Sequence, residues 1–223
     1  MIKAIVTDIE GTTSSLSFVK EVLFPYAREH IGDYIRSHAE EEKIVPLLND
    51  VRRQAGEDLD LEGVITQLQR WIDEDRKVTA LKTLQGLIWE AGYQQGDFKG
   101  HIYDDAQQKL LQWHQQGIAL YVYSSGSVYA QKLLFGHTEY GDLTPLFTGY
   151  FDTQVGAKTE TTSYLNIVKA IGCAANEILF LSDIEAELDA AKAAGMQTTW
   201  LVRDTAPDNN AIHRQVADFR NIH

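Results

Sequence analysis

The chain begins with the stretch IKAIVTDIEGTT, residues 2–13, in which an apolar run changes abruptly into a polar turn. The run from Ile2 to Val6 has the length and composition of a short buried strand. The turn that follows carries two acidic side chains, Asp8 and Glu10, separated by one residue. We interpret this stretch as a strand whose carboxyl end presents acidic groups.

The pattern then changes to apolar residues at helical spacing, from about Ser17 to Tyr93. They form successive sets that predict about four helices and no strand: Val22, Tyr26, Ile31 and Ile35; Ile44, Leu47, Leu48 and Val51; Leu61, Ile65, Leu68 and Ile72; Leu81, Leu84 and Ile88. We read this block as a helical cap inserted after the first strand.

After Gly100 the pattern alternates between strands and helices. The predicted strands are 118–123, 150–151, 178–181 and 197–202, and the predicted helices are 104–116, 128–135, 163–171 and 186–194. A polar loop is expected over 204–210. The segment from Ala211 is ambiguous, and we read it as a helix followed by a short strand near Phe219. This alternation predicts an α/β fold with a Rossmann-like parallel sheet.

The expected organisation is therefore two domains. Residues 1–14 and 99–223 form the α/β catalytic core, and residues 15–98 form the helical cap. A chain of 223 residues is long enough for a domain that carries such an insert.

Polar side chains follow several of the predicted strands. In parallel sheets ligands bind at the carboxyl ends of the strands, so these residues are expected to meet. They are Asp8 and Glu10 after the first strand, Ser124-Ser125-Gly126-Ser127 after the second, Lys158 after the third, and Asp183 with Glu187 after the fourth.

These residue types suit phosphoryl transfer, which depends on positioning and charge neutralisation. Asp8 and Asp183 offer carboxylate oxygens to Mg²⁺, and Asp8 is a candidate nucleophile that would form an aspartyl phosphate. Glu10 could protonate the leaving oxygen and later activate water. Ser124 and the amides after it suit a phosphate oxygen, and Lys158 supplies a positive charge.

Each of these elements is common by itself. An acidic turn, a serine-rich helix cap, a surface lysine and an aspartate cap all occur without any catalytic role. Their joint placement after consecutive strands is what favours a site. Other chemistries lack support, because the sequence has no H-E-x-x-H and no G-x-S-x-G, and residues 156–159, GAKT, do not complete a phosphate-binding P-loop.

Composition restricts the partners. The formal net charge of −12 argues against nucleic acid and anionic membrane surfaces, but not against a small phosphorylated substrate held by a local cation. One cysteine, Cys173, allows no intrachain disulfide. No apolar stretch approaches the roughly 20 residues that span a bilayer. We expect a cytoplasmic protein.

The residues at the four strand ends resemble the motifs of the haloacid dehalogenase superfamily. That superfamily usually has a second aspartate where this chain has Glu10. A glutamate at this position resembles the first motif of one subfamily, the enolase-phosphatases of methionine salvage. Three stretches carry this likeness: residues 8–13, residues 123–127, and the pattern Lys82-x-x-Gln85-Gly86-x-x-Trp89-x-x-Gly92-Tyr93-x-x-Gly96.

The resemblance implies the superfamily core with a helical cap and a two-step reaction. A diketone, 2,3-diketo-5-methylthiopentyl-1-phosphate, would be enolised and then dephosphorylated to an acireductone. Asp8 would be nucleophile and metal ligand, Glu10 acid/base and ligand through its carbonyl, and Asp183 the other ligand of Mg²⁺. Substrate binding would fall to Ser124, Ser125 and Lys158.

The resemblance also implies a monomer, and it leaves the role of Glu187 open. The alternative function is another phosphatase of the superfamily, acting on a sugar phosphate or phosphoglycolate. A non-catalytic module such as a response-regulator receiver gathers similar side chains, but it is far shorter and lacks the helical insert.

Overall fold

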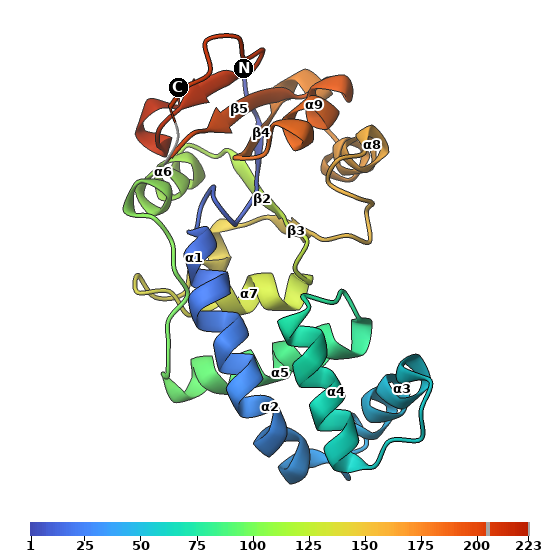
Figure 1. The fold of residues 1–223 in the computed structure, drawn as a ribbon. Coiled ribbons are helices and arrows are strands. Elements are labelled where there is room, and N and C mark those ends of the chain that lie inside the picture. The colour runs from blue at the N-terminus through green and yellow to red at the C-terminus, as the bar shows by residue number, and fades with distance from the viewer. Residues whose placement is uncertain (204–205, 223) are drawn as a thin grey trace. The chain divides into compact units, whose positions relative to one another are not determined.

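A computed structural model describes residues 1–203 and 206–222. The chain forms two compact units: Met1–Leu16 with Gly100–His223, and Ser17–Lys99 (Figure 1). The first two residues of the polar loop expected over 204–210 lie outside the described residues. Each unit has its own buried core and is described separately.

The first unit is built on a parallel sheet. In the described part of the chain it has six strands, in the order β3-β2-β1-β4-β5-β6. Their bounds are β1 Ala4–Thr7, β2 Ala119–Tyr123, β3 Gly149–Phe151, β4 Ile178–Ser182, β5 Gln197–Leu201 and β6 Arg214–Val216. The predicted α/β class with a parallel sheet is confirmed.

Strand β1 lies in the middle of this sheet and decides where a ligand can bind. It pairs with β2 on one side and β4 on the other, so that Thr7 lies level with both Val122 and Leu181. Strand order reverses at this point, and in open α/β sheets such a reversal opens a crevice at the carboxyl ends of the strands. The residues that follow β1, β2 and β4 therefore share one edge.

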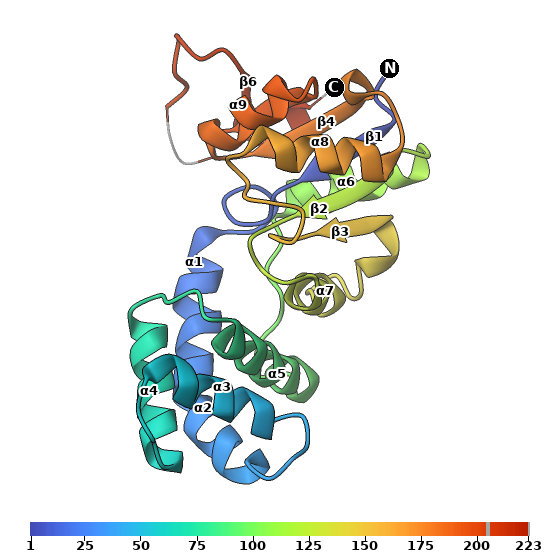
Figure 2. The ribbon, with the colours of Figure 1, turned by 90° about the vertical axis from the view of Figure 1, so that its right-hand side faces the viewer.

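Helices cover both faces of the sheet (Figure 2). Helix α6, Asp104–Gln115, lies on one face, and α8, Thr161–Ile171, and α9, Glu185–Ala193, lie on the other. Helix α7 is Val128–Gly136, and the 3₁₀ turns that precede β4 are Thr144–Leu146 and Ala175–Glu177. Alternate strand residues enter opposite cores, so Val6 and Phe180 pack in the cluster with α8 and α9.

The second unit is helical. It contains a π-helical turn, Val19–Leu23, and the helices α2 Phe24–His38, α3 Val45–Ala55, α4 Leu61–Asp73 and α5 Thr79–Gln95, with the short α1, Leu16–Phe18, at its start. Their apolar faces meet in one core that includes Ile31, Leu68 and Leu84. None of the helices that the structure describes has the length and apolar character needed to cross a membrane.

The pattern that begins at Lys82 lies on α5, and packing explains much of it. A Cβ on Gly92 would lie 2.5 Å from the Phe98 ring and 2.8 Å from the Tyr26 ring, so glycine allows these rings to approach the helix. Trp89 donates its ring N–H to the Leu23 carbonyl at 2.8 Å. These residues hold the helices of this unit together.

The interpretation of the segment after Ala211 is wrong in its order. The strand comes first, as β6, and a 3₁₀ turn, Phe219–Asn221, follows it. The physical reason is an edge pairing: β6 adds to β5 in parallel, with Val216 level with Leu201. A strand of three residues is too short to show a period, and the Phe219 ring packs against Trp113 instead of extending the sheet.

Replacement of Phe180 by alanine tests the core of the sheet unit. The Phe180 side chain is fully buried and makes an edge contact with the Tyr164 ring. We expect Phe180→Ala to lower the free energy of unfolding by about 3–5 kcal/mol, because it leaves a cavity. Urea denaturation followed by near-UV circular dichroism measures this. Leu165→Ala, on the exposed side of α8, is the control, and equal losses for both variants would contradict the assignment of the core.

Candidate active site

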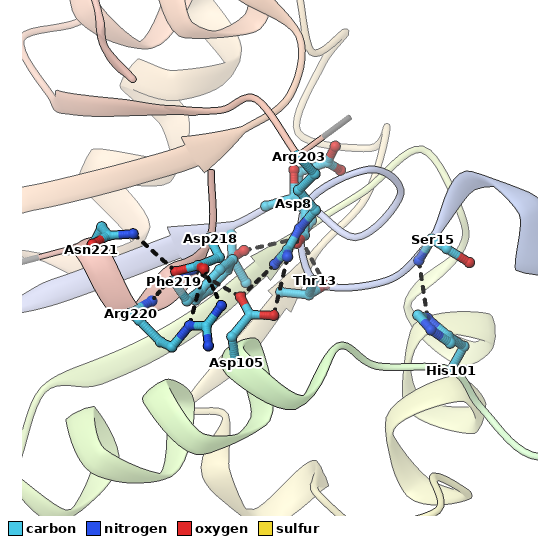
Figure 3. Close-up of polar contacts among 12 residues, drawn as sticks. Asp8, Thr13, Ser15, His101, Asp105, Arg203, Asp218, Phe219, Arg220 and Asn221 are labelled. Carbon is cyan, nitrogen blue, oxygen red and sulfur yellow. Dashed lines mark hydrogen bonds and ion pairs between the residues drawn. The ribbon is translucent and has the colours of Figure 1, made fainter. Parts of the chain in front are cut away.

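Asp8 is the first residue after β1 and is buried. Its amide continues the sheet by donating to the Leu181 carbonyl at 2.9 Å. Its own carbonyl accepts hydrogen bonds from the hydroxyls of Thr7 at 3.0 Å and Thr13 at 3.1 Å (Figure 3). The backbone of Asp8 is therefore fixed on both sides, and its carboxylate is held at the edge of the sheet.

Lys158 reaches the Asp8 carboxylate from the segment between β3 and α8. Its Nζ lies 2.5 Å from Asp8 Oδ1 and 2.8 Å from Glu187 Oε2. Glu187 Oε2 also accepts the Ser182 hydroxyl at 2.8 Å, and the Lys158 carbonyl accepts the Tyr164 hydroxyl at 2.7 Å. The ammonium is thus held in place between two carboxylates.

The charge of Lys158 follows from this pairing. Burial lowers the pKa of the amine, but the Asp8 and Glu187 carboxylates outweigh that effect and raise the pKa above its usual range. The side chain is 8% exposed, so water does little to screen the contact. Lys158 therefore remains an ammonium at neutral pH.

Asp183 is the first residue after β4, on the same edge as Asp8. Its carbonyl accepts the Trp200 ring N–H at 2.9 Å, whereas its buried Oδ1 has no hydrogen-bond partner among the described residues. Gly11 lies against the carboxylate: a Cβ there would fall 2.1 Å from Asp183 Oδ2, and the residue has a φ of +72°. Glycine is required both for the turn and for this close approach.

The acidic groups of this edge repel one another. Burial, together with the nearby Asp8 carboxylate, raises the pKa of Asp183 to about 7. Burial and Asp8 also raise the pKa of Glu187. The described residues thus bring three carboxyl groups to the ammonium of Lys158.

These observations fit a hard divalent cation at this edge. An additional positive charge would relieve the repulsion between Asp8 and Asp183 and give Asp183 Oδ1 a partner. Within the described residues there is no group of three or more His, Cys, Asp or Glu that would hold a metal by itself. Mg²⁺ does not need one, because it usually takes one or two carboxylates with waters and substrate phosphate.

Glu10 lies on the loop between β1 and α1 and is half-buried. The loop folds around the Ile9 carbonyl, which accepts the amides of Thr12, Thr13 and Ser14 at 3.2, 3.0 and 2.8 Å. The loop that carries Glu10 is therefore an ordered turn.

The serine-rich segment after β2 leads into α7. Ser124 is buried, and its hydroxyl accepts the Gly126 amide at 3.2 Å, whereas Ser125 is exposed. Ser127 is the N-cap of α7 and accepts the Ala130 amide at 3.2 Å. Backbone amides at a helix start form a ready site for phosphate oxygens.

Two further residues support this segment, and the sequence reasoning did not single them out. Buried Gln131 donates from Nε2 to the Gly126 carbonyl at 2.8 Å and the Phe151 carbonyl at 2.9 Å. Asp152 accepts the Val128 amide at 3.3 Å. Asp152 comes directly after a predicted strand, as Asp8 does, and its position could have marked it as a site residue. Gln131 lies inside a helix, and no local sequence pattern indicates that a glutamine there would support a neighbouring loop.

The sequence is similar to known hydrolases. The sequence model of the haloacid dehalogenase-like hydrolases matches residues 2–195. Enolase-phosphatase E1 of Methylococcus capsulatus is 60% identical over 98% of this chain and 96% of its own length. The protein of the same name from Thioalkalivibrio sulfidiphilus is 58% identical, over 100% and 99%. The crystal structure of the UTR4 protein of Saccharomyces cerevisiae has a TM-score of 0.84 and 33% identity, with all of both chains covered.

The raised pKa of Asp183 predicts a stability effect that depends on pH. A carboxyl whose folded pKa exceeds its usual 3.8 destabilises the fold progressively as pH rises towards 7. Without metal at pH 8, we expect Asp183→Asn to be more stable than the natural protein, by roughly 1–3 kcal/mol. At pH 5 this gain should shrink. Millimolar Mg²⁺ should raise the melting temperature of the natural protein at pH 8, and not that of Asp183→Asn.

Thermal melts by circular dichroism, with and without Mg²⁺, measure both effects. Glu185→Gln removes an exposed carboxyl two residues further along the chain and is the control. A metal-free Asp183→Asn protein that melts below the natural protein at pH 8 would show that the carboxylate is not strained by its surroundings.

Proposed function

The chain belongs to the haloacid dehalogenase-like hydrolase family, and we propose that it is a Mg²⁺-dependent phosphatase of the enolase-phosphatase type. The observation that carries this proposal is the contact between Lys158 Nζ and Asp8 Oδ1, together with Asp183 Oδ1, which has no hydrogen-bond partner in the part of the chain that the structure describes. The high identity to proteins named Enolase-phosphatase E1, over nearly the whole chain, supports the type of reaction.

The proposed substrate is 2,3-diketo-5-methylthiopentyl-1-phosphate. The product, 1,2-dihydroxy-3-keto-5-methylthiopentene, has a double bond between C1 and C2. A proton must therefore leave C1 and a proton must reach the C2 oxygen before the ester is hydrolysed. Enolisation and phosphate release are the two steps that the site has to support.

The residues that would hold Mg²⁺ are Asp8 and Asp183 through their carboxylates and Glu10 through its backbone carbonyl. The bound cation would neutralise negative charge on the phosphate and allow a carboxylate to approach it. The remaining carboxyl of the cluster, Glu187, contacts Lys158 and Ser182, which suits a role in holding the lysine.

The chain's own residues then account for phosphate transfer. A carboxylate oxygen of Asp8 attacks phosphorus, the bond from phosphorus to the substrate oxygen breaks, and Glu10 gives that oxygen a proton. Glu10 next takes a proton from water, which attacks the aspartyl phosphate. The bond between phosphorus and Asp8 breaks, and inorganic phosphate leaves with Asp8 regenerated.

Binding of the phosphate is assigned to Ser124, Ser125 and Lys158. The ammonium already faces Asp8, so a phosphate approaching the nucleophile meets a positive charge. The amides at the start of α7 add hydrogen-bond donors without adding charge. A small phosphorylated substrate is compatible with a net charge of −12, because a bound cation together with Lys158 would supply positive charge at this one edge.

Enolisation needs a base near C1 and a positive centre near the ketone oxygen. We assign the base to Glu10, because its side chain reaches one methylene further than aspartate. Lys158 is the candidate for the positive centre among the chain's own residues. Glu10 takes the proton from C1, and the C2 oxygen receives a proton from solvent water. The protonated Glu10 is then the acid for the step in which the phosphate ester breaks.

The helical unit is proposed to act as the cap. It is inserted directly after the loop that carries Asp8 and Glu10, and its proposed role is to exclude water while a reactive enol is present. The division into a catalytic core, 1–14 with 99–223, and a cap, 15–98, stays a prediction. Action as a cytoplasmic monomer is proposed with it.

Replacement of the nucleophile tests the phosphatase activity. Asp8→Asn keeps the shape of the side chain but cannot form an acyl phosphate, so phosphate release with Mg²⁺ should fall by a factor on the order of 10⁴ or more. The assay compares the diketone phosphate with a sugar phosphate and phosphoglycolate, and Asp58→Asn, an exposed aspartate, is the control. Faster turnover of either competing ester would replace the proposed substrate.

Replacement of Glu10 tests the base. In Asp8→Asn enzyme, which cannot release phosphate, enolisation is followed by NMR as exchange of the C1 proton for deuterium in D₂O. Adding Glu10→Gln should slow this exchange by about 10²–10⁴-fold, because the amide cannot take the proton. Exchange at an unchanged rate would remove Glu10 from the first step, and Glu185→Gln again serves as the control.

A further inference from the structure

Arg203 lies at the carboxyl edge of the sheet, two residues after β5, and its hydrogen bonds to the described residues end on Thr12 and Asp105, which have no proposed chemical step. Its Nε donates to the Thr12 carbonyl at 2.9 Å (Figure 3). Thr12 belongs to the loop that carries Asp8 and Glu10. Arg203 therefore reaches the nucleophile loop from a part of the chain 191 residues away.

The rest of the guanidinium is held by the segment that returns from the helical unit. Its two terminal nitrogens contact both carboxylate oxygens of Asp105, at 3.1 and 2.9 Å. The guanidinium also lies 3.8 Å from the centre of the Tyr103 ring. Asp105 accepts the Phe219 amide at 2.8 Å, so the carboxylate has a second fixed partner (Figure 3). The bidentate ion pair with Asp105, together with the stacking on the Tyr103 ring, fixes the orientation of the Arg203 guanidinium.

The two chain segments that lead into and out of the helical unit both lie beside the Arg203 guanidinium. The outgoing segment offers the Thr12 carbonyl to Arg203 and the Thr13 carbonyl to the Tyr103 amide, at 2.9 Å each. The returning segment supplies Tyr103, and the first turn of α6, which follows it, supplies Asp105. The side chains of Arg203 and Asp105 are 10% and 13% exposed, so the pair is shielded from water. The two segments are thus fastened to each other and to the end of β5.

The Thr12 carbonyl belongs to the hydrogen-bonded turn that also holds the backbone of Asp8. The Thr12 amide donates to the Ile9 carbonyl, and the Thr13 hydroxyl donates to the Asp8 carbonyl. The Thr12 side chain adds no tether, because its buried hydroxyl has no hydrogen-bond partner among the described residues. Displacement of Thr12 would therefore move the turn that places Asp8 and Glu10.

We propose that Arg203 is a positioning residue for phosphoryl transfer: it holds the loop 8–13 through Thr12, with Asp105 and Tyr103 fixing the guanidinium. The inference rests on the proposed function only where it names phosphoryl transfer as the reaction that the loop serves. In-line attack depends on the placement of the nucleophile, and a shift of about 1 Å can cost 10²-fold in rate. Lysine could not replace the arginine, because one ammonium cannot serve both the carbonyl and the two carboxylate oxygens.

The test separates positioning from stability. Arg203→Met alone leaves the mostly shielded Asp105 carboxylate without its cation, which destabilises the fold. The double variant Arg203→Met with Asp105→Asn removes that charge and keeps an acceptor for the Phe219 amide. Arg220→Met is the matched control, because this nearby arginine pairs with Asp218 at the surface.

In the double variant we expect a melting temperature restored towards that of the natural protein, a kcat lower by about 10- to 100-fold, and a KM changed by less than about twofold. Hydrogen exchange, read on peptides covering residues 9–14, should quicken there and not in the strands. The Arg220→Met control should leave all four readouts unchanged.

Hydrogen exchange is measured without substrate, so it tests whether Arg203 holds the loop 8–13 even if the protein does not turn over the diketone phosphate. In that case kcat is measured on whichever phosphate ester the natural protein hydrolyses. A double variant with natural kcat, or with unchanged exchange over residues 9–14, would overturn the proposal. So would a loss confined to KM.

Discussion

The ammonium of Lys158 lies between the carboxylates of Asp8 and Glu187 in a part of the molecule almost closed to water. An isolated charge in such a place would be strongly disfavoured, and each of the three groups is tolerated because the others are there. The arrangement remains unbalanced, because Asp183 adds a further carboxyl and its Oδ1 has no partner among the described residues. An edge with an excess of acid can receive a cation and, through it, an anionic phosphate. Its chemistry therefore follows from how these charges are gathered.

The sheet gathers them because its strands are parallel and β1 lies at the reversal of strand order. Asp8 and Asp183 each come directly after one of two paired strands, so the same register that satisfies the backbone also brings their carboxylates together. Gly11 lets the loop after β1 approach Asp183, where any side chain would collide with the carboxylate. The stability of the sheet and the repulsion at its edge thus have a common origin. Carboxyl groups whose pKa is perturbed in this way are typical of functional sites.

Around this centre, a second set of contacts holds backbone in place. Gln131 and Asp152 support the segment that follows β2, and Arg203 supports the loop that follows β1. None of the three has a proposed chemical step. Their hydrogen bonds reach backbone groups of Gly126, Val128 and Thr12, which lie in or beside the loops that carry the proposed site residues. Such contacts give short loops the rigidity that positioning requires.

The sequence by itself determined the alternation of strands and helices, the helical insert, and the residues that follow each strand. These are local properties, because period, strand length and the change from apolar to polar residues are written in neighbouring positions. The likeness of residues 8–13 to one subfamily also came from a contiguous stretch, in which Glu10 was the distinguishing residue. The short edge strand β6 escaped this reasoning, because three residues carry no period and its partner β5 decided its conformation.

Only the tertiary structure decided which side chains meet. Lys158 and Asp8 are 150 residues apart, and Arg203 and Thr12 are 191 apart, so no spacing in the sequence could pair them. Arg203 also comes directly after a predicted strand. The fact that it is an arginine could not show whether it holds the loop 8–13 or is an ordinary charged residue at the surface. Its role depends on Asp105, Tyr103 and the Thr12 carbonyl converging from other segments. The sequence thus specifies which groups stand at the ends of the strands, and the fold decides their neighbours, because pairing depends on distance in space and not along the chain.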